Sequence, residues 1–327
     1  MSKSLKIGVL GAGHLGKIHL RLLNESKKYD LVGFYDEDPA VRKAVHESFG
    51  FHPFSSVDTL LDAVDVVDIV TPTLFHHALA KKAIVSGKHI FLEKPITKTV
   101  EEAQELIDLA AKHHVLGQVG HVERFNPAFL AVKDHIKDSM FIETHRLSEF
   151  NPRGTDVPVV LDLMIHDIDT VLSLVHSKVS NISASGVSII SETPDIANAR
   201  IEFENGCVAN LTASRISLKS MRKARFFQKD AYISIDYLSK KVEVVKMEDA
   251  PENIGSFDMV LENAQGAKKR IYFDNPEVAE VNAIQMELEC FAKSICTGAP
   301  VIVPMQQGLH ALDIALQVSA LVEKSAK

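Results

Sequence analysis

Lys6-Ile7-Gly8-Val9-Leu10-Gly11-Ala12-Gly13-His14-Leu15-Gly16 joins a short apolar run to a G-x-G-x-x-G pattern near the start of the chain. The apolar run predicts a buried strand, and the apolar spacing after Gly16 predicts a helix. In this pattern Gly11 makes a tight turn, Gly13 lets a pyrophosphate approach the backbone, and Gly16 lets helix and strand pack closely. The amides at the helix start, at His14 and Leu15, would hold the phosphates with help from the helix dipole.

An acidic residue follows at the spacing that a dinucleotide site requires. The apolar stretch 31–35 predicts a second strand, and it ends on Asp36, about twenty residues after Gly16. A carboxylate there accepts a hydrogen bond from a ribose 2′-hydroxyl and repels a 2′-phosphate, so we expect NAD rather than NADP. Arg42 lies close enough in sequence to soften that preference. The alternative is a helix-starting turn followed by an incidental acid.

Composition narrows the class of protein. The chain has 327 residues, which suits two domains, and its 46% apolar and 24% charged content is that of a globular protein. A formal charge of -7 without a basic run argues against nucleic acid or an anionic membrane surface as a partner. No apolar run reaches the ~20 residues that span a bilayer. Three cysteines without a disulfide or zinc pattern indicate a reducing compartment, so we expect a cytoplasmic protein.

Strands and helices alternate through the first 120 residues. Strands are expected at 66–70, 89–92 and 115–119, with helices between them. Short connections in such an alternation predict a parallel, doubly wound α/β sheet, and we assign residues 1–120 to a dinucleotide-binding domain. Ligands bind beyond the carboxyl ends of strands in these sheets. The polar segments Thr71-Pro72, Glu93-Lys94-Pro95 and Gly120-His121 fall at those ends.

Among these segments, Lys94 is the most specific candidate for a residue that takes part in the chemistry. It precedes a proline and directly follows a buried strand, so its backbone is kept out of the helical region and its ammonium can be aimed at one point. The alternative is a solvated lysine in a turn. The pairs His76-His77 and His113-His114 lie on expected helices and have no second cluster of ligands, so we expect no metal site.

From residue 121 the alternation stops, and residues 121–327 form the second expected domain. Consecutive strand-like stretches follow one another without helices, and Asn205-Gly206 between two of them is a hairpin signal. This pattern predicts an α+β domain with a large, mostly antiparallel open sheet. Two closing helices are expected at 277–295 and 306–323, free to stay with this domain or to pack back on the first.

The apolar stretch 159–175 predicts a helix with a polar stripe. Asp162, His166 and Asp169 are spaced i, i+4 and i+7, which stacks them on one face of a regular helix. A carboxylate one turn from a histidine can orient the imidazole, which suits a general base. The alternative is a narrow solvated stripe on a half-buried helix.

Three separated motifs together resemble the glucose–fructose oxidoreductase/inositol dehydrogenase (Gfo/Idh/MocA) family. They are the glycine pattern followed by His19, the Thr71-Pro72 loop with His76, and Glu93-Lys94-Pro95. The resemblance implies a Rossmann domain in which Thr71, Pro72, His76, Glu93 and Lys94 contribute to cofactor binding.

The family also has an Asp-x-Gly-x-His helix that supplies its catalytic histidine, and Asp162 and His166 match those positions. Met164 stands where the family usually has glycine. A larger side chain there would narrow the space beside the substrate, so this difference bears on the shape of the ligand more than on the reaction. The resemblance therefore implies Lys94, Asp162 and His166 as catalytic residues that also touch the substrate.

The expected function is an NAD-dependent dehydrogenase acting on a secondary hydroxyl of a sugar-like substrate. The segment 120–127 looks most like sugar-nucleotide-oxidising members, in particular UDP-N-acetylglucosamine 3-dehydrogenases. Arg124, Asn126 and Arg153 are the added candidates for substrate binding, and a guanidinium suits a diphosphate. Two alternatives stay open: a free-sugar or inositol dehydrogenase, and a non-catalytic NAD-binding regulator. The family resemblance also implies a homodimer or homotetramer formed through the second-domain sheet.

Overall fold

The protein is described by a computed structural model covering residues 4–151, 157–250 and 259–325. It divides into two compact units. Unit 1 comprises Met1–Phe125 and Asn282–Asp313, and unit 2 comprises Asn126–Val281 and Ile314–Lys327. Both units contain segments that are distant in sequence, because the chain returns to unit 1 after residue 281 and leaves it again after residue 313.

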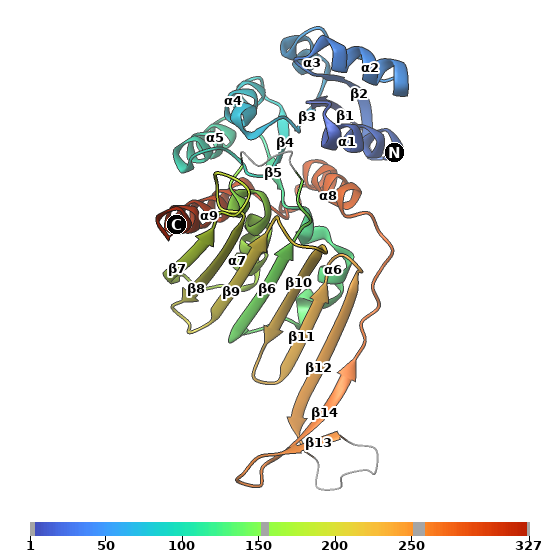
Figure 1. Cartoon of the computed structure of the whole chain (residues 1–327). Helices are drawn as coiled ribbons and strands as arrows, with labels where there is room; N and C mark the ends of the chain where they lie inside the picture. Colours follow the sequence, from blue (N-terminus) through green and yellow to red (C-terminus); the bar gives the residue numbers. More distant parts are fainter. Residues whose placement is uncertain (1–3, 152–156, 251–258, 326–327) are drawn as a thin grey trace. The chain divides into compact units, whose positions relative to one another are not determined.

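Unit 1 is built on a five-stranded parallel sheet with the strand order β2-β1-β3-β4-β5 (Figure 1). Its strands are β1 (Leu5–Leu10), β2 (Tyr29–Tyr35), β3 (Val66–Ile69), β4 (His89–Glu93) and β5 (Gly117–Gly120). The strand order reverses beside β1, and such a reversal point is where open α/β sheets bind ligands.

Helices connect the strands of unit 1, and their ends carry local sequence signals. Asp38 caps one helix by accepting from the Ala40 amide, and Gly50 ends it in the left-handed conformation. Ser56 and Thr59 form a reciprocal capping box on the next helix. The helices are α1 (His14–Glu25), α2 (Pro39–Phe49), α3 (Val57–Ala63), η1 (Thr73–Phe75), α4 (His76–Val85), α5 (Val100–His113), η2 (Val122–Phe125) and α8 (Ala283–Thr297).

Helix α8 completes the core of unit 1 although it comes from the far end of the chain. Leu288, Phe291 and Ala292 are buried against apolar residues of β1, α1 and β4. The Tyr29 hydroxyl donates to the Leu288 carbonyl oxygen at 2.8 Å, which fixes the helix to β2. The first domain therefore has its apolar core closed by residues near position 290.

Unit 2 is built on a nine-stranded sheet with the strand order β13-β14-β12-β11-β10-β6-β9-β8-β7 (Figure 1). Neighbouring strands are antiparallel except for the central pair β6 and β9, which is parallel. The strands are β6 (Phe141–Leu147), β7 (Val179–Val187), β8 (Ile196–Phe203), β9 (Val208–Ser214), β10 (Met221–Phe227), β11 (Ala231–Asp236), β12 (Lys241–Asp249), β13 (Met259–Glu262) and β14 (Lys268–Asp274).

The two faces of the nine-stranded sheet differ in character. In β8, Ala197, Ala199 and Ile201 are buried, whereas Asn198 and Arg200 between them are exposed. Helices α6 (Pro127–Val132) and α7 (Ile165–Leu174) pack on the sheet, α6 against β11 and β12, and α7 against β6 and β9. This alternation is typical of an antiparallel sheet with one core face and one solvated face.

The helical elements of unit 2 include one irregular turn. Residues Val160–Met164 form a π-helical turn that runs directly into a regular α-helix. The elements are α6 (Pro127–Val132), η3 (Lys133–His135), the π turn η4 (Val160–Met164), α7 (Ile165–Leu174) and α9 (Met305–Ser325), of which α9 begins in unit 1 and ends in unit 2. In the described residues, no helix is both long enough and apolar enough to span a membrane.

The predicted fold class is confirmed: a parallel doubly wound sheet is followed by a large, mostly antiparallel one. Three details differ from the sequence-based expectations. The expected single helix 159–175 begins with a π turn, β13 was not expected, and the core pair β6–β9 is parallel.

Candidate active site

The glycine turn of unit 1 has the geometry that a pyrophosphate site requires. Gly11 has a φ of +95°, and a Cβ there would lie 2.8 Å from the Val70 carbonyl oxygen. A Cβ on Gly16 would lie 2.0 Å from the Gly11 carbonyl oxygen, so only glycine lets α1 start this close to the turn. A Cβ on Gly13 would meet nothing within 4 Å. The first and third glycines thus shape the turn, while the second borders open space at the start of α1.

Asp36 is fixed in place at the end of β2. Its carboxylate accepts from the Ala12 amide at 2.7 Å and from the Asp38 amide at 3.0 Å, so it is tied to the glycine turn. Arg42 lies beside it: its guanidinium donates to the carbonyl oxygen of Asp36 and lies 5.4 Å from the centre of the Tyr35 ring.

These residues border a cleft of about 690 Å³ in unit 1. The cleft is large enough for the adenosine end of a dinucleotide, and its walls combine apolar side chains with a few polar groups. Fourteen residues line it: Leu10, Gly11, Gly13, Tyr35, Asp36, Glu37, Asp38, Val57, Val70, Thr71, Pro72, Phe75, Ala78 and Leu79. Five of the predicted cofactor residues therefore lie in this wall: Gly11, Gly13, Asp36, Thr71 and Pro72. Three more, His14, Leu15 and Gly16, follow Gly13 in the first turn of α1.

His76 joins the ends of β3 and β4. Its Nε2 lies 2.8 Å from the Thr71 carbonyl oxygen, and its Nδ1 lies 2.9 Å from the Pro95 carbonyl oxygen. Burial lowers the pKa of this imidazole, and the two carbonyl oxygens act against that effect. The side chain therefore holds the Thr71-Pro72 loop against the Glu93-Lys94-Pro95 segment, so its position fits a supporting role for the cleft.

Lys94 lies at the carboxyl end of β4, partly exposed, beside a buried acid. The Glu93 carboxylate accepts from the Lys94 amide at 3.2 Å. Its other oxygen lies 3.5 Å from the Nε2 of His19, whose Nδ1 lies 2.9 Å from Asp68. Through its backbone amide, Lys94 therefore contacts Glu93, the first of three buried ionisable side chains that continue through His19 to Asp68.

In unit 2 the predicted polar stripe is split between two kinds of helical turn. Asp162 lies in the π turn, whereas His166 and Asp169 lie in α7. Asp162 and His166 are partly exposed and Asp169 is buried, so the stripe is not a uniformly solvated face. The wider π turn changes the rotational offset between Asp162 and His166 from that of a regular helix.

Sequence reasoning missed the residue that anchors α7 to the sheet. Arg146 on β6 and Asp167 on α7 form a buried two-pronged ion pair, with both N–O distances at 3.0 Å. Asp167 lies next to His166, so the pair fixes the rotation of the helix that presents His166. The pairing joins positions 21 residues apart in sequence, and no local pattern signals it.

The three substrate-binding candidates have different surroundings. Arg124 is partly exposed in unit 1 and donates to the Gln307 side chain at 3.2 Å. Asn126 is buried in unit 2, where it caps α6 at the Ala128 amide and donates to the Tyr237 carbonyl oxygen. Arg153 lies outside the described residues.

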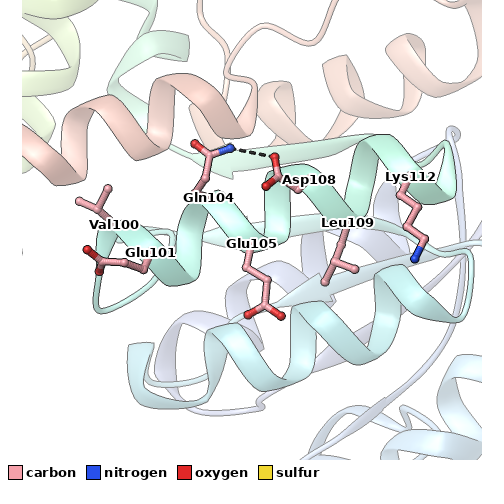
Figure 2. A pocket seen from close by; sticks show the side chains of 7 residues that line it. All are labelled: Val100, Glu101, Gln104, Glu105, Asp108, Leu109 and Lys112. Atoms are coloured by element: carbon pink, nitrogen blue, oxygen red, sulfur yellow. Dashed lines mark hydrogen bonds between the residues drawn. The ribbon is translucent and has the colours of Figure 1, made fainter.

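A second hollow, about 600 Å³, runs along the outer side of α5 (Figure 2). Figure 2 shows its lining side chains on this one helix, with a hydrogen bond of 2.9 Å between Gln104 and Asp108. Glu105 is already paired with Lys81 and His77 of α4. None of the predicted site residues lies in this groove, and its polar lining fits a solvated helix surface.

A parallel sheet with a G-x-G-x-x-G turn, an acidic residue at the end of the second strand and a lysine at another strand end is typical of a dinucleotide-dependent enzyme. Comparison with known proteins supplies the family. The description "Oxidoreductase family, NAD-binding Rossmann fold" matches residues 5–121, and "GFO/IDH/MocA C-terminal domain" matches residues 115–231. The chain belongs to the GFO/IDH/MocA oxidoreductase family, as its motifs predicted.

Relatives cover nearly the whole chain. A UDP-N-acetylglucosamine 3-dehydrogenase of Acidithiobacillus ferrooxidans is 34% identical over 324 residues, covering 98% of this chain and 97% of the relative. Its solved structure superposes with a TM-score of 0.88 and covers 99% of each chain at 33% identity. An inositol 2-dehydrogenase of Rhizobium meliloti is 25% identical, with 98% of each chain covered. A Lactobacillus casei scyllo-inositol dehydrogenase with bound NAD(H) and scyllo-inositol shares the fold, with a TM-score of 0.79 at 22% identity and with 99% of this chain and 98% of that chain covered.

Proposed function

We propose that this protein is an NAD-dependent dehydrogenase that oxidises a secondary hydroxyl of a UDP-N-acetylglucosamine-type sugar nucleotide, at the 3-position. The observation that carries the proposal is the 34% identity, over nearly the full length of both chains, to a UDP-N-acetylglucosamine 3-dehydrogenase. The retention of Lys94, Asp162 and His166 together supports catalysis over a non-catalytic regulator, which has no need of all three.

The chain's residues divide the chemistry between them. NAD, held at the glycine turn and Asp36, supplies the hydride acceptor. His166 takes the hydroxyl proton as general base, and Asp162 orients and charge-balances it. Lys94 hydrogen-bonds the reacting oxygen and stabilises the negative charge that develops there. The fixed carboxylate of Glu93 at the Lys94 amide supports this placement of the lysine.

NAD is proposed over NADP because Asp36 is held rigidly in the cleft wall. Its two amide hydrogen bonds prevent the carboxylate from turning away from a 2′-phosphate. At ~4 Å and an effective dielectric of ~20, one such charge repulsion costs about 4 kcal/mol. Arg42 reduces that penalty by placing a positive charge beside Asp36. Titration of both cofactors against the protein tests the preference, and comparable affinities would contradict it.

Phosphate recognition is assigned to arginine. We propose that Arg124 and Arg153 bind the substrate diphosphate and that Asn126 helps to shape the site. Charge-assisted bonds from a guanidinium to phosphate oxygens are stronger than those available to a neutral sugar. Replacement of either arginine should raise KM for the nucleotide sugar more than for a free sugar.

The test is NADH formation with UDP-N-acetylglucosamine, N-acetylglucosamine and myo-inositol measured side by side. We expect fastest turnover with the UDP-sugar. Faster turnover of myo-inositol or of the free sugar would overturn the substrate proposal in favour of a free-sugar or inositol dehydrogenase. A single-turnover measurement on the protein as purified guards against a retained cofactor that masks activity.

The exposed face of the nine-stranded sheet is proposed as the surface of self-association in a homodimer or homotetramer. Phe141, Phe227 and Tyr232 cluster on it, with ring centres 5.8 and 5.2 Å apart. Arg225 and Arg200 add charged side chains to the same face, which the strand register aligns. Light scattering during size exclusion tests the assembly, and a monomer would contradict it.

We also propose a cytoplasmic location, since the three cysteines show no disulfide pattern.

A further inference from the structure

The interior of unit 1 contains a chain of charged side chains that the proposed reaction does not use. His19 on α1 and Asp68 on β3 are completely buried, and Glu93 on β4 is 8% exposed. Two close approaches link them: His19 Nδ1 to Asp68 at 2.9 Å, and His19 Nε2 to Glu93 at 3.5 Å. A buried charge costs several kcal/mol of folding free energy unless it is paired, so three ionisable side chains buried together indicate a functional role.

The space around Glu93 is shaped for its carboxylate. A Cβ on Gly120 of β5 would lie 2.8 Å from a Glu93 carboxylate oxygen, so this glycine leaves the volume that the acid occupies. The His19 ring also packs edge-on against Phe91, with centres 5.9 Å apart. Each ring nitrogen of the imidazole therefore lies within 3.5 Å of a carboxylate oxygen.

The surrounding charges favour an imidazolium at His19. Burial alone lowers the pKa of this group, but Asp68 and then Glu93 outweigh burial, and the pKa is raised. Burial raises the pKa of Glu93, which favours its neutral form, and Asp68 adds to that effect. His19 is the largest influence in the opposite direction, followed by Lys94.

A further buried acid near this chain favours its own neutral form. Glu287 on α8 is completely buried, and burial raises its pKa well above the usual range, with Glu93 and Asp68 adding to the effect. In its neutral form Glu287 adds no like charge beside Glu93. The charged groups that act on Glu93 are thus Asp68, which favours its neutral form, and His19 and Lys94, which favour its carboxylate.

We propose that His19 is a positioning residue for Lys94: as an imidazolium held by Asp68, it keeps the buried Glu93 carboxylate ionised, and that carboxylate keeps Lys94 charged and in place. The inference rests on the proposed role of Lys94 in the reaction. An ammonium at Lys94 is needed at the reacting oxygen. Glu93 supplies a counter-charge to it, and the Glu93 carboxylate also accepts from the Lys94 backbone amide. Loss of the cation at His19 would neutralise Glu93 and remove that counter-charge.

The experiment is the pH profile of kcat/KM for the wild type and His19→Gln. The alkaline limb reports Lys94 losing its proton, and the acid limb reports His166 gaining one. In His19→Gln we expect the alkaline limb to move down by about one pH unit, the size of effect that an opposite charge nearby exerts. The acid limb should not move, and neither should the affinity for NAD. The exposed His46 provides the matched control, His46→Gln, with both limbs unchanged.

A double-variant comparison separates positioning from structure. If His19 acts through Glu93, then Glu93→Gln alone should move the alkaline limb by a similar amount. Adding His19→Gln to Glu93→Gln should then move it no further. Independent structural damage would give additive effects instead. Should His19→Gln fail to fold, His19→Asn, which also removes the cation, is expected to move the limb in the same direction.

The possible outcomes distinguish this inference from the proposed function. An unmoved alkaline limb in His19→Gln, with Lys94→Ala inactive, would overturn the role of His19 alone. Wild-type turnover in Lys94→Ala would overturn the role of Lys94 and the inference with it. If no substrate of the panel turns over, the same comparison uses ¹³C-dimethylated Lys94, assigned by its loss in Lys94→Arg. Its NMR titration should then move to lower pH in His19→Gln, and an unmoved titration would contradict the inference.

Discussion

The two sheets of this protein hold charged side chains in opposite ways. In unit 1, Asp68 and Glu93 of the parallel sheet are buried together with His19 of α1. In the nine-stranded sheet of unit 2, pairs such as Arg225–Glu143 lie on the exposed face. A parallel sheet is covered on both faces, so a charge within it is costly and indicates a function, whereas a charge on a solvated face is ordinary.

The largest effects test whether each unit supplies one part of the chemistry. Lys94→Ala in unit 1 and His166→Ala in unit 2 should each lower kcat by ~10²- to 10⁴-fold, the usual loss for an acid–base or charge-stabilising group. NAD affinity should stay close to wild type in both, because neither residue belongs to the glycine turn. Steady-state kinetics with a cofactor titration measure this. The exposed Lys98 and His176 provide the controls Lys98→Ala and His176→Ala, which should keep wild-type kcat. A wild-type kcat in Lys94→Ala or His166→Ala would remove that residue from the mechanism.

The next effect concerns the exception in unit 2, the buried pair of Arg146 and Asp167. Arg146→Ala leaves the Asp167 carboxylate buried without this partner, and we expect a loss of about 3 to 5 kcal/mol in the free energy of unfolding. Arg225→Ala, which breaks an exposed pair with Glu143, should cost no more than about 1 kcal/mol. Urea unfolding measures both. Equal losses would show that burial does not make the two pairs differ in their contribution to stability.

A third pair of variants compares two glycines of the same turn in unit 1. Gly16→Ala places a methyl group against the Gly11 carbonyl oxygen, so we expect a loss of stability of about 3 kcal/mol, at the upper end of overpacking costs. Gly13→Ala has open space around its methyl group and should change stability by less than about 0.5 kcal/mol while weakening NAD binding. Thermal unfolding and cofactor titration are the measurements. Unchanged NAD affinity in Gly13→Ala would argue against pyrophosphate at this position.

The smallest effect is a pH-dependent one in unit 2. Asp195 is buried and accepts from the amides of Ile189, Ile190 and Ser191. Burial alone would raise its pKa, but the amides outweigh it and lower the pKa from 3.8 to about 2. A depressed carboxyl pKa stabilises the fold above the unfolded-state value and loses that contribution as the pH falls toward the folded value.

We therefore expect Asp195→Asn to lose about 2 kcal/mol of stability at neutral pH. The difference from wild type should shrink between pH 4 and pH 2. Unfolding curves across this range measure the difference, and a gap that stays constant with pH would contradict the electrostatic explanation.

How much the sequence predicts also differs between the units. The glycine turn, the strand ends and Asp36 follow from local patterns, because a turn type and a strand end are set by a few neighbouring residues. The Arg146–Asp167 pair and the parallel pairing of β6 with β9 depend on contacts between distant segments, which periodicity does not report. The π turn at Val160–Met164 was missed because its apolar spacing over one turn resembles that of a regular helix. The short, largely exposed strand β13 has no buried alternation to signal it.

Helix α8 has a consequence for the order in which this protein can acquire its structure during synthesis. A ribosome releases about 5 to 20 residues per second, N-terminal first, so the five strands of unit 1 emerge well before the residues that close their core. Until Leu288, Phe291 and Ala292 arrive, the apolar surface of β1 and α1 that they cover stays open to solvent. The nascent first domain thus passes through an interval in which it is exposed to aggregation. A fragment ending at residue 125 would carry that same uncovered surface permanently.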